Sequence, residues 1–158
     1  MLALYGGLYD GGGPATKKQG AQKKFANKQE IAAIQKTLDA ARKAEAEAQK
    51  LAEEADDLAV IKAPGARAKK LEHAAKVREA QGLKQRAIAE AVSAYGIDVS
   101  KSKSVLYGAD NTDGESETDD EGRVSIGDDA FKTPGWLAST IAHESEVHVN
   151  LQLRGGRN

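Results

Sequence analysis

Residues 58–67, Leu-Ala-Val-Ile-Lys-Ala-Pro-Gly-Ala-Arg, contain the break that decides the fold. Pro64 cannot continue an α-helix, because it lacks the N–H and its ring clashes with the preceding turn, and Gly65 permits a chain reversal. On either side, apolar residues recur at steps of three and four, which is typical of a helix with one buried face. We therefore predict two long antiparallel helices, over 25–60 and 66–95, that form an αα-hairpin.

The apolar stripe of both helices consists largely of alanine. Alanine buries little surface but lets helices approach closely, so we expect the hairpin to act as a stalk or spacer and to pack on something else as well. Gly96 is typical of a helix C-terminus and ends the second helix. The predicted buried positions are Ile31, Ile34, Leu38, Ala41, Ala44, Ala48, Leu51, Ala55 and Leu58 in the first helix, and Leu71, Ala74, Val77, Ala80, Leu83, Ala87, Ala91 and Tyr95 in the second.

The amino-acid composition limits the chemistry of the chain. Charged residues make up 30% of the 158 positions and aromatic residues 4%, which is typical of long helices and not of a large aromatic core. The chain contains no cysteine, which excludes disulfide bonds, thiolate zinc sites and cysteine nucleophiles. A metal site in this chain therefore has to use histidine, aspartate or glutamate.

The formal charge changes sign along the chain. Residues 1–103 carry 19 basic and 13 acidic side chains, whereas residues 104–158 carry 4 and 11. Such a change suggests two units with different roles. The acidic half disfavours nucleic-acid binding, because phosphate contacts need cations. No run approaches the roughly 18 apolar residues of a membrane helix, so we expect no membrane insertion, and the first residues make a poor signal peptide.

These patterns divide the chain into three segments. Residues 1–26 form a flexible Gly-rich and basic lead-in. Residues 27–96 form the α-helical hairpin, and residues 97–158 form a small α+β unit. The predicted fold class is therefore mainly α with a small α+β tip.

Within the α+β unit we expect a β-hairpin and a C-terminal helix. Strands around 104–107 and 123–127 show apolar alternation, and they are expected to pair across a long acidic loop at 110–121. Thr133 is a suitable N-cap, with Pro134 in the first turn, for a helix that runs to about residue 153.

Two of the three histidines lie in this last helix, in the sequence His143-Glu144-Ser-Glu146-Val-His148. Zinc peptidases typically carry His-Glu-x-x-His, in which the histidines lie one turn apart and the glutamate activates water. Here the histidines are five residues apart, which places them about 140° apart on an ideal helix. They can bind one ion only if the helix contains a one-residue bulge of the π type.

A regular helix gives a different pairing of the same residues. Glu144 and His148 are four residues apart, and His143 and Glu146 are three apart, so each pair shares a helix face. In that interpretation the two pairs lie on different faces of a solvated helix, either as hydrogen-bonded or metal-binding pairs or simply as charge pairs. The spacing leaves both arrangements open.

The histidine spacing resembles that of the dipeptidyl peptidase III family, whose His-Glu-x-x-x-His helix binds zinc, although this chain has Val147 where that family has glycine. A longer stretch, residues 123–152, resembles the C-terminal toxin modules of bacterial RHS-repeat and related polymorphic toxins. The shared features are a strand that ends in Ile-Gly, then Ala-Phe, then Leu-Ala-Ser-Thr and a His-Glu helix that ends near Gln152.

This resemblance implies an effector domain that acts as a zinc-dependent metallopeptidase on a protein substrate. It implies that His143 and His148 are ligands of Zn²⁺ and that Glu144 is the general base. It also implies a secreted effector, delivered by a larger secretion system into a target cell, with no signal peptide of its own. An immunity protein or a chaperone is then the expected partner.

A catalytic zinc usually has three protein ligands, and the source of the third is left open. It comes from the acidic segment 110–129, from His73, or from residues missing here. The toxin modules continue into a further acidic helix, so in the last case the chain is truncated before its third ligand. Ser139 and Thr140 lie one turn before His143 and are candidates for orienting its ring.

The alternative function is non-enzymatic. In it the α-hairpin is an adaptor or delivery segment, and the acidic end of the chain binds a chaperone or an immunity protein. Bound zinc and a functional requirement for Glu144 distinguish the peptidase from the adaptor.

Overall fold

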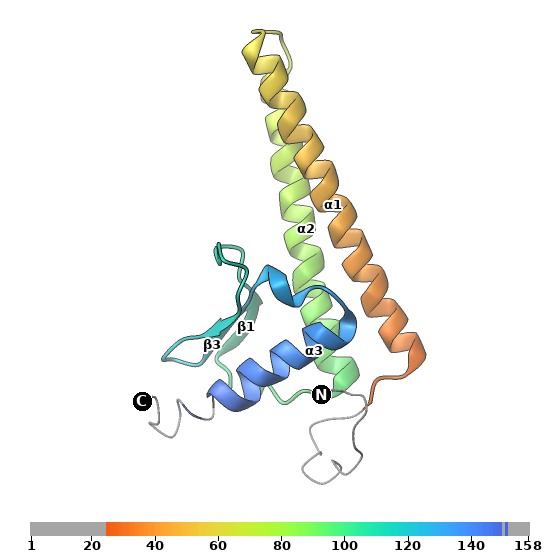
Figure 1. Cartoon of the computed structure of the whole chain (residues 1–158), viewed down its shortest axis with the longest axis vertical. Coiled ribbons are helices and arrows are strands. Elements are labelled where there is room, and N and C mark those ends of the chain that lie inside the picture. The colour runs from red at the N-terminus through yellow and green to blue at the C-terminus, as the bar shows by residue number, and fades with distance from the viewer. Residues whose placement is uncertain (1–24, 150, 152–158) are drawn as a thin grey trace.

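The long αα-hairpin predicted around Pro64 and Gly65 is present (Figure 1). The structure, a computed structural model, describes residues 25–149 and 151. Helix α1 spans Lys28–Val60 and helix α2 spans Ala66–Tyr95. The strands and the C-terminal helix gather at one end of the hairpin and form a head (residues 97–149 and 151) on a helical stalk. The predicted fold class is confirmed.

Local hydrogen bonds fix the ends of both long helices. The Asn27 side chain accepts from the Glu30 backbone N–H, and the Glu30 carboxylate accepts from the Asn27 N–H, which makes a capping box. This box starts α1 at Lys28, three residues later than predicted. Gly65 and Gly96 have positive φ angles of 103° and 61°, which glycine adopts at little cost. They turn the chain after α1 and end α2.

Most of the predicted alanine-lined face is buried between the two helices. Ile31 and Leu71 are exceptions, because they remain 38% and 64% exposed. Leu71 lies in the first turns of α2, far from the head, where two helices alone cannot cover a large side chain. The buried residues of α1 are Ile34, Thr37, Leu38, Ala41, Ala44, Ala48 and Ala55, and those of α2 are Ala80, Lys84, Ala87, Ile88, Ala91 and Ala94.

The head contains a three-stranded sheet whose order is β1-β3-β2. Strand β1 spans Ser104–Tyr107, β2 spans Glu117–Thr118 and β3 spans Arg123–Ile126. The prediction that β1 and β3 form a β-hairpin is wrong, because these two strands are parallel. Instead the acidic segment contributes β2, which pairs antiparallel with β3. The connection from β1 to β3 is longer than the dozen residues that a parallel crossover needs.

The turn between β2 and β3 explains why those two strands form the hairpin. Asp119 accepts hydrogen bonds from the backbone N–H groups of Glu121 and Arg123, both at 2.9 Å. Gly122 takes a positive φ of 84°. This compact turn places β3 antiparallel to β2. Strand β3 then pairs with β1 along its other edge, in the parallel direction.

Helix α2 covers the outer edge of β1. The Gln85 side chain accepts from the Tyr107 backbone N–H at 2.8 Å and donates to the Val105 carbonyl at 3.3 Å. A strand edge with bonded backbone groups is protected from pairing with another chain. The sheet is thereby attached to the stalk by its backbone as well as by its side chains.

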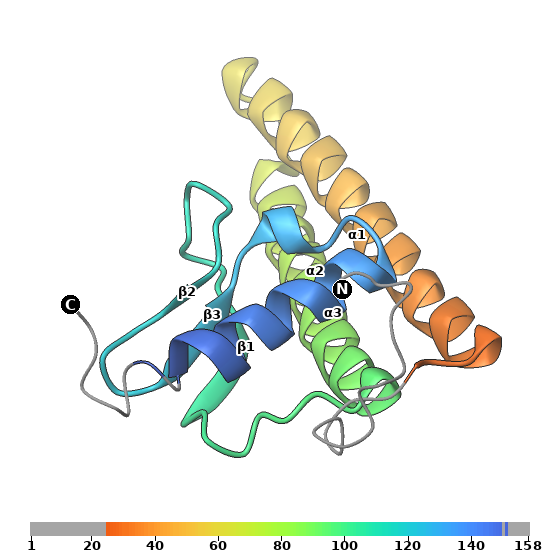
Figure 2. The same ribbon diagram turned by 60° about the horizontal axis from the view of Figure 1, so that its bottom comes forward.

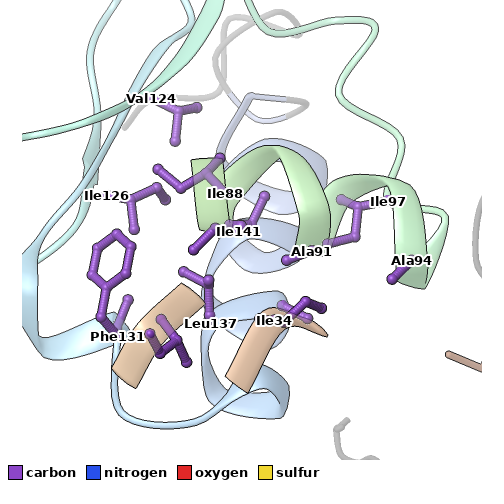
Figure 3. Close-up of a cluster of buried hydrophobic side chains, with 14 of the residues drawn as sticks. Ile34, Ile88, Ala91, Ala94, Ile97, Val124, Ile126, Phe131, Leu137 and Ile141 are labelled. Carbon is purple, nitrogen blue, oxygen red and sulfur yellow. The ribbon is translucent and has the colours of Figure 1, made fainter. Parts of the chain in front are cut away.

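The hydrophobic core lies where the base of the hairpin meets the head (Figure 3). Leu137 and Ile141 of the C-terminal helix are fully buried there. They belong to one cluster with Ile34 of α1, Ile88 of α2 and Ile126 of β3. The predicted segments 27–96 and 97–158 therefore share a single core.

The C-terminal helix begins as predicted. A single turn of 3-10 helix, Asp128–Ala130, leads into α3, which spans Pro134–Ala142. The Thr133 side chain accepts from the Trp136 backbone N–H at 3.1 Å, and Pro134 lies in the first turn. Figure 2 shows α3 crossing the base of α2 between the strands and α1.

A buried lysine joins the stalk to the head. The side chain of Lys84 in α2 is 5% exposed and pairs with Glu45 of α1 and, at 2.6 Å, with Asp128. The Tyr107 hydroxyl donates to the same Asp128 oxygen at 2.7 Å. Burial alone lowers the Lys84 pKa, but the hydrogen bonds and charges of Asp128 and Glu45 outweigh burial and raise that pKa to about 12. Lys84 was not among the residues predicted from the sequence pattern.

Within the described residues, no helix is both long and apolar enough to cross a membrane. The predicted lead-in lies outside the described residues up to position 24, as does the predicted end of the C-terminal helix.

Candidate metal centre

The helix that follows α3 changes its pitch at the histidines. Residues His143–His148 form a π-helical turn between α3 and Val149. A π turn holds one more residue than an α turn, so side chains five apart lie one above the other. Of the two arrangements that the spacing left open, the structure has the one with the one-residue bulge that a shared metal ion requires.

The two imidazole rings meet on one side of this turn. The Nε2 atoms of His143 and His148 lie 2.9 Å apart. The ring centroids are separated by 4.5 Å, and the ring planes stand at 86°. The two rings therefore direct these nitrogens toward one another, at hydrogen-bond distance.

The arrangement of a regular helix, in which His143 pairs with Glu146, is wrong. The Glu146 carboxylate instead accepts a hydrogen bond from the Asp98 backbone N–H at 3.0 Å. This bond joins the π turn to the segment that follows α2. Glu146 therefore faces the protein on a different side from the histidine pair.

Glu144 completes the cluster. One ligand atom each from His143, Glu144 and His148 lies within 4.8 Å of the others, so this group can hold a metal ion. Glu144 is 7% exposed, whereas His143 is exposed and His148 is half-buried. The cluster is thus anchored on its glutamate side and open on its histidine side.

Thr118 of β2 fixes the glutamate. Its hydroxyl donates to Glu144 Oε1 at 2.7 Å. Thr118 is placed there by its pairing with Val124 of β3, so the sheet supports the carboxylate. Thr118 could not be predicted from the sequence pattern, because only the observed strand order brings residue 118 to residue 144.

The expected sources of a third ligand do not reach the cluster. His73 lies in the stalk, with its Nδ1 atom 2.8 Å from the Ala48 carbonyl. No acidic side chain of 110–129 joins the group, which is the one such cluster among residues 25–149 and 151. Thr140 does not orient His143 as expected, because its hydroxyl donates to the Trp136 carbonyl at 2.9 Å.

Comparisons of the chain with protein-family models, with curated proteins and with solved structures find no match. The resemblance to polymorphic-toxin modules therefore stays a prediction. The metal-binding capacity of the cluster rests on its geometry alone.

Proposed function

We propose that this chain is the C-terminal effector module of a polymorphic toxin and hydrolyses peptide bonds with the help of zinc. The observation that supports this proposal is the π turn, which brings two histidine nitrogens and a buried glutamate to one point. An irregular helix at such a place is typical of functional sites. In the proposal His143 and His148 hold the ion and Glu144 is the general base.

The donor set suits zinc. Imidazole nitrogen and carboxylate oxygen are ordinary zinc ligands. Two nitrogens that bind one tetrahedral zinc at about 2.0–2.1 Å lie roughly 3.3 Å apart. The observed separation of 2.9 Å needs only a small opening of the histidine pair to reach that value.

Zinc bound here supplies a Lewis acid that polarises the carbonyl of the peptide bond to be cleaved. The oxygen of a water molecule attacks the carbonyl carbon, and Glu144 takes the proton that this water loses. Glu144 then returns the proton to the leaving nitrogen as the C–N bond breaks. Thr118 occupies Oε1 of Glu144, so Oε2 is the oxygen available for this proton.

The variant Glu144→Gln tests the role of the glutamate. If Glu144 is the base, the variant keeps zinc and loses peptide hydrolysis by about a hundredfold or more. Metal analysis of the purified protein and cleavage of a casein substrate measure the two properties. Loss of zinc in this variant would show that Glu144 is a ligand and would overturn its assignment as the base.

The biological setting is part of the same proposal. A secretion system delivers the module into a target cell, and an immunity protein protects the producing cell. Expression of the chain inside bacterial cells is then expected to stop growth, and expression of Glu144→Gln is not. Equal growth with both proteins, together with absence of bound zinc, would favour the non-enzymatic adaptor.

A further inference from the structure

The C-terminal helix is apolar on two opposite faces. Its inner face carries Leu137, Ile141 and Val149, all 0% exposed. Its outer face carries Trp136, Val147 and Leu151, which are 54%, 46% and 44% exposed. A helix with an apolar face toward solvent has a surface that remains to be covered.

These exposed residues form a line along the helix that passes through the metal cluster. Trp136 and His143 are seven residues apart, which is two α-helical turns. Val147 follows His143 inside the π turn, where residues five apart are aligned, so Val147 lies beside the column formed by His143 and His148 and not directly above His143. Leu151 follows Val147 one turn later. We call Trp136, Val147 and Leu151 the outer apolar line. His143 is also exposed and lies between Trp136 and Val147 along the helix.

One charged side chain lies directly against this line, because the ammonium nitrogen of Lys132 is 5.4 Å from the centroid of the Trp136 ring. Between Thr133 and Leu151 the described charged residues are Glu144 and Glu146. Glu144 is bonded to Thr118, and Glu146 is bonded to the Asp98 backbone. Away from Lys132, the exposed side chains of the line are apolar, which favours a ligand with apolar side chains.

The size of the line argues against a permanent partner. A large aromatic side chain buries roughly 150–250 Å², so three half-exposed side chains offer at most about 400 Å². A stable interface needs roughly 800 Å² on each partner. An occupant of this face also covers His143 and therefore the metal cluster. A ligand that binds transiently over the metal cluster therefore fits both the small area of the line and its position beside His143.

We infer that the outer apolar line is the substrate-binding surface, and that it takes an extended peptide with apolar side chains on both sides of the bond to be cleaved. This inference rests on the proposed function. Trp136 lies about 10 Å along the helix from His143, and an extended peptide advances about 3.3 Å per residue. Trp136 therefore contacts a side chain about three residues from that bond, and Val147 and Leu151 contact apolar side chains on its other side.

The test uses the single tryptophan of the chain, Trp136. Zinc-loaded Glu144→Gln protein binds but does not cleave, so peptide binding is followed by Trp136 fluorescence. The probes are two uncharged, end-capped decapeptides, one with leucine at alternate positions and one with serine at the same positions. We expect saturable binding and a blue shift with the leucine peptide, and binding at least about tenfold weaker with the serine peptide.

Variants in the same background locate the surface. Val147→Ser and Leu151→Ser are each expected to weaken leucine-peptide binding about tenfold and to keep zinc. Leu71→Ser is the matched control, because Leu71 is 64% exposed at the far end of the stalk, and it is expected to bind as the parent does. Equal binding of both peptides, or unchanged binding in Val147→Ser and Leu151→Ser, would overturn the inference.

Two further readouts separate this inference from the proposed function. If wild-type protein cleaves both peptides equally well, the peptidase proposal stands and the inference fails. If wild-type protein holds no zinc and cleaves neither peptide, the proposed function itself fails. Sedimentation tests whether a second copy of the chain occupies this surface. A dimer that Val147→Ser dissociates would identify the outer apolar line as a contact between two copies and would overturn the inference.

Discussion

At the scale of single residues, the position of Glu144 depends on Thr118. The carboxylate is buried, and a buried acceptor that loses its donor costs roughly 1–3 kcal/mol. The Thr118 hydroxyl also decides which carboxylate oxygen is left for chemistry. A residue on a two-residue strand thus controls a group 26 positions away in the sequence.

We predict that Thr118→Val lowers both stability and peptide hydrolysis, while Thr118→Ser restores them. Valine keeps the shape of threonine and removes the donor, so the free energy of unfolding is expected to fall by about 1–3 kcal/mol. Urea unfolding and kcat measure the two effects. If Thr118→Val and Thr118→Ser unfold and react alike, the hydroxyl has no positioning role.

The histidines and the glutamate of this site could be predicted from the sequence, whereas its support could not. The five-residue spacing of His143 and His148 already required a π turn if both were to meet. Thr118 lies in a segment whose pattern shows only acidic charge, and its place beside Glu144 follows from the strand order. Local periodicity predicts faces of elements, but it does not predict which strands pair.

At the scale of elements, the π turn holds one extra residue without disturbing its flanks. Ile141 before the turn and Val149 after it both face the core. In a regular α-helix, seven residues bring a side chain back to nearly the same face. The eight positions from Ile141 to Val149 keep that alignment because the π turn absorbs one of them.

Deletion of Val147 is therefore expected to convert the π turn into an α turn and to preserve the site. The histidines then lie four apart on one face, and Val149 keeps its place in the core. Circular dichroism and metal analysis should show a folded protein that retains zinc. As the opposing change, one alanine inserted after Val147 rotates Val149 out of the core and should abolish zinc binding. Zinc loss in the deletion variant would contradict this account of the turn.

The link between stalk and head depends on Lys84. Its pKa is raised to about 12, so its ion pairs stabilise the folded state fully below about pH 10.5 and are lost as the pH rises through 12. The pKa of Asp128 is lowered, because the hydrogen bonds from Lys84 and Tyr107 outweigh burial, which alone would raise it. The Asp128 contribution is present above its ordinary pKa of 3.8 and is lost as the pH falls below that value.

We predict that Lys84→Met lowers the free energy of unfolding by about 2 kcal/mol at pH 7. The difference from wild type should shrink above about pH 12, because the wild-type lysine then loses its charge. Urea titrations at pH 7, 9 and 12 measure this. Lys76→Met serves as the control, since its pairs with Glu47 and Glu79 are largely exposed and contribute less than about 1 kcal/mol. Equal losses in both variants would show that burial of Lys84 has no special effect.

The elements themselves differ in how far the sequence predicts them. The Pro64–Gly65 break and the three-and-four spacing predict both long helices to within three residues. The threonine cap and Pro134 predict the start of α3. Such rules do not predict the parallel pairing of β1 and β3. The alternation of apolar residues in a four-residue strand is the same whether the strand pairs in a parallel or an antiparallel direction.

At the scale of the whole molecule, the hairpin carries its far half away from the head (Figure 1). The large buried side chains that the hairpin contributes to the core all lie at the base of the hairpin. They are Ile34 and Leu38 in α1 and Ile88 in α2. Farther out, the face between the helices is mainly alanine. The far half therefore contributes little to the folding of the head.

Replacement of residues 52–70 by a four-residue Gly-Ser turn is expected to shorten the stalk and leave the head intact. Residues 51 and 71 are suitable joining points, because contacts between the helices include Glu54 with Lys69 and Ala48 with His73. Zinc content and peptide hydrolysis should stay within about twofold of the full chain. Loss of both in a folded, shortened protein would show that the stalk takes part in the site.

The central claim is that the π turn binds zinc through His143 and His148. The most direct measurement is the zinc content of the purified chain, beside His148→Ala and His73→Ala. His73 is the matched control, because it is the one histidine outside the cluster. We predict one zinc per chain in wild type and in His73→Ala, and less than a tenth of that in His148→Ala. Equal zinc content in all three proteins, or none in any of them, would contradict the claim.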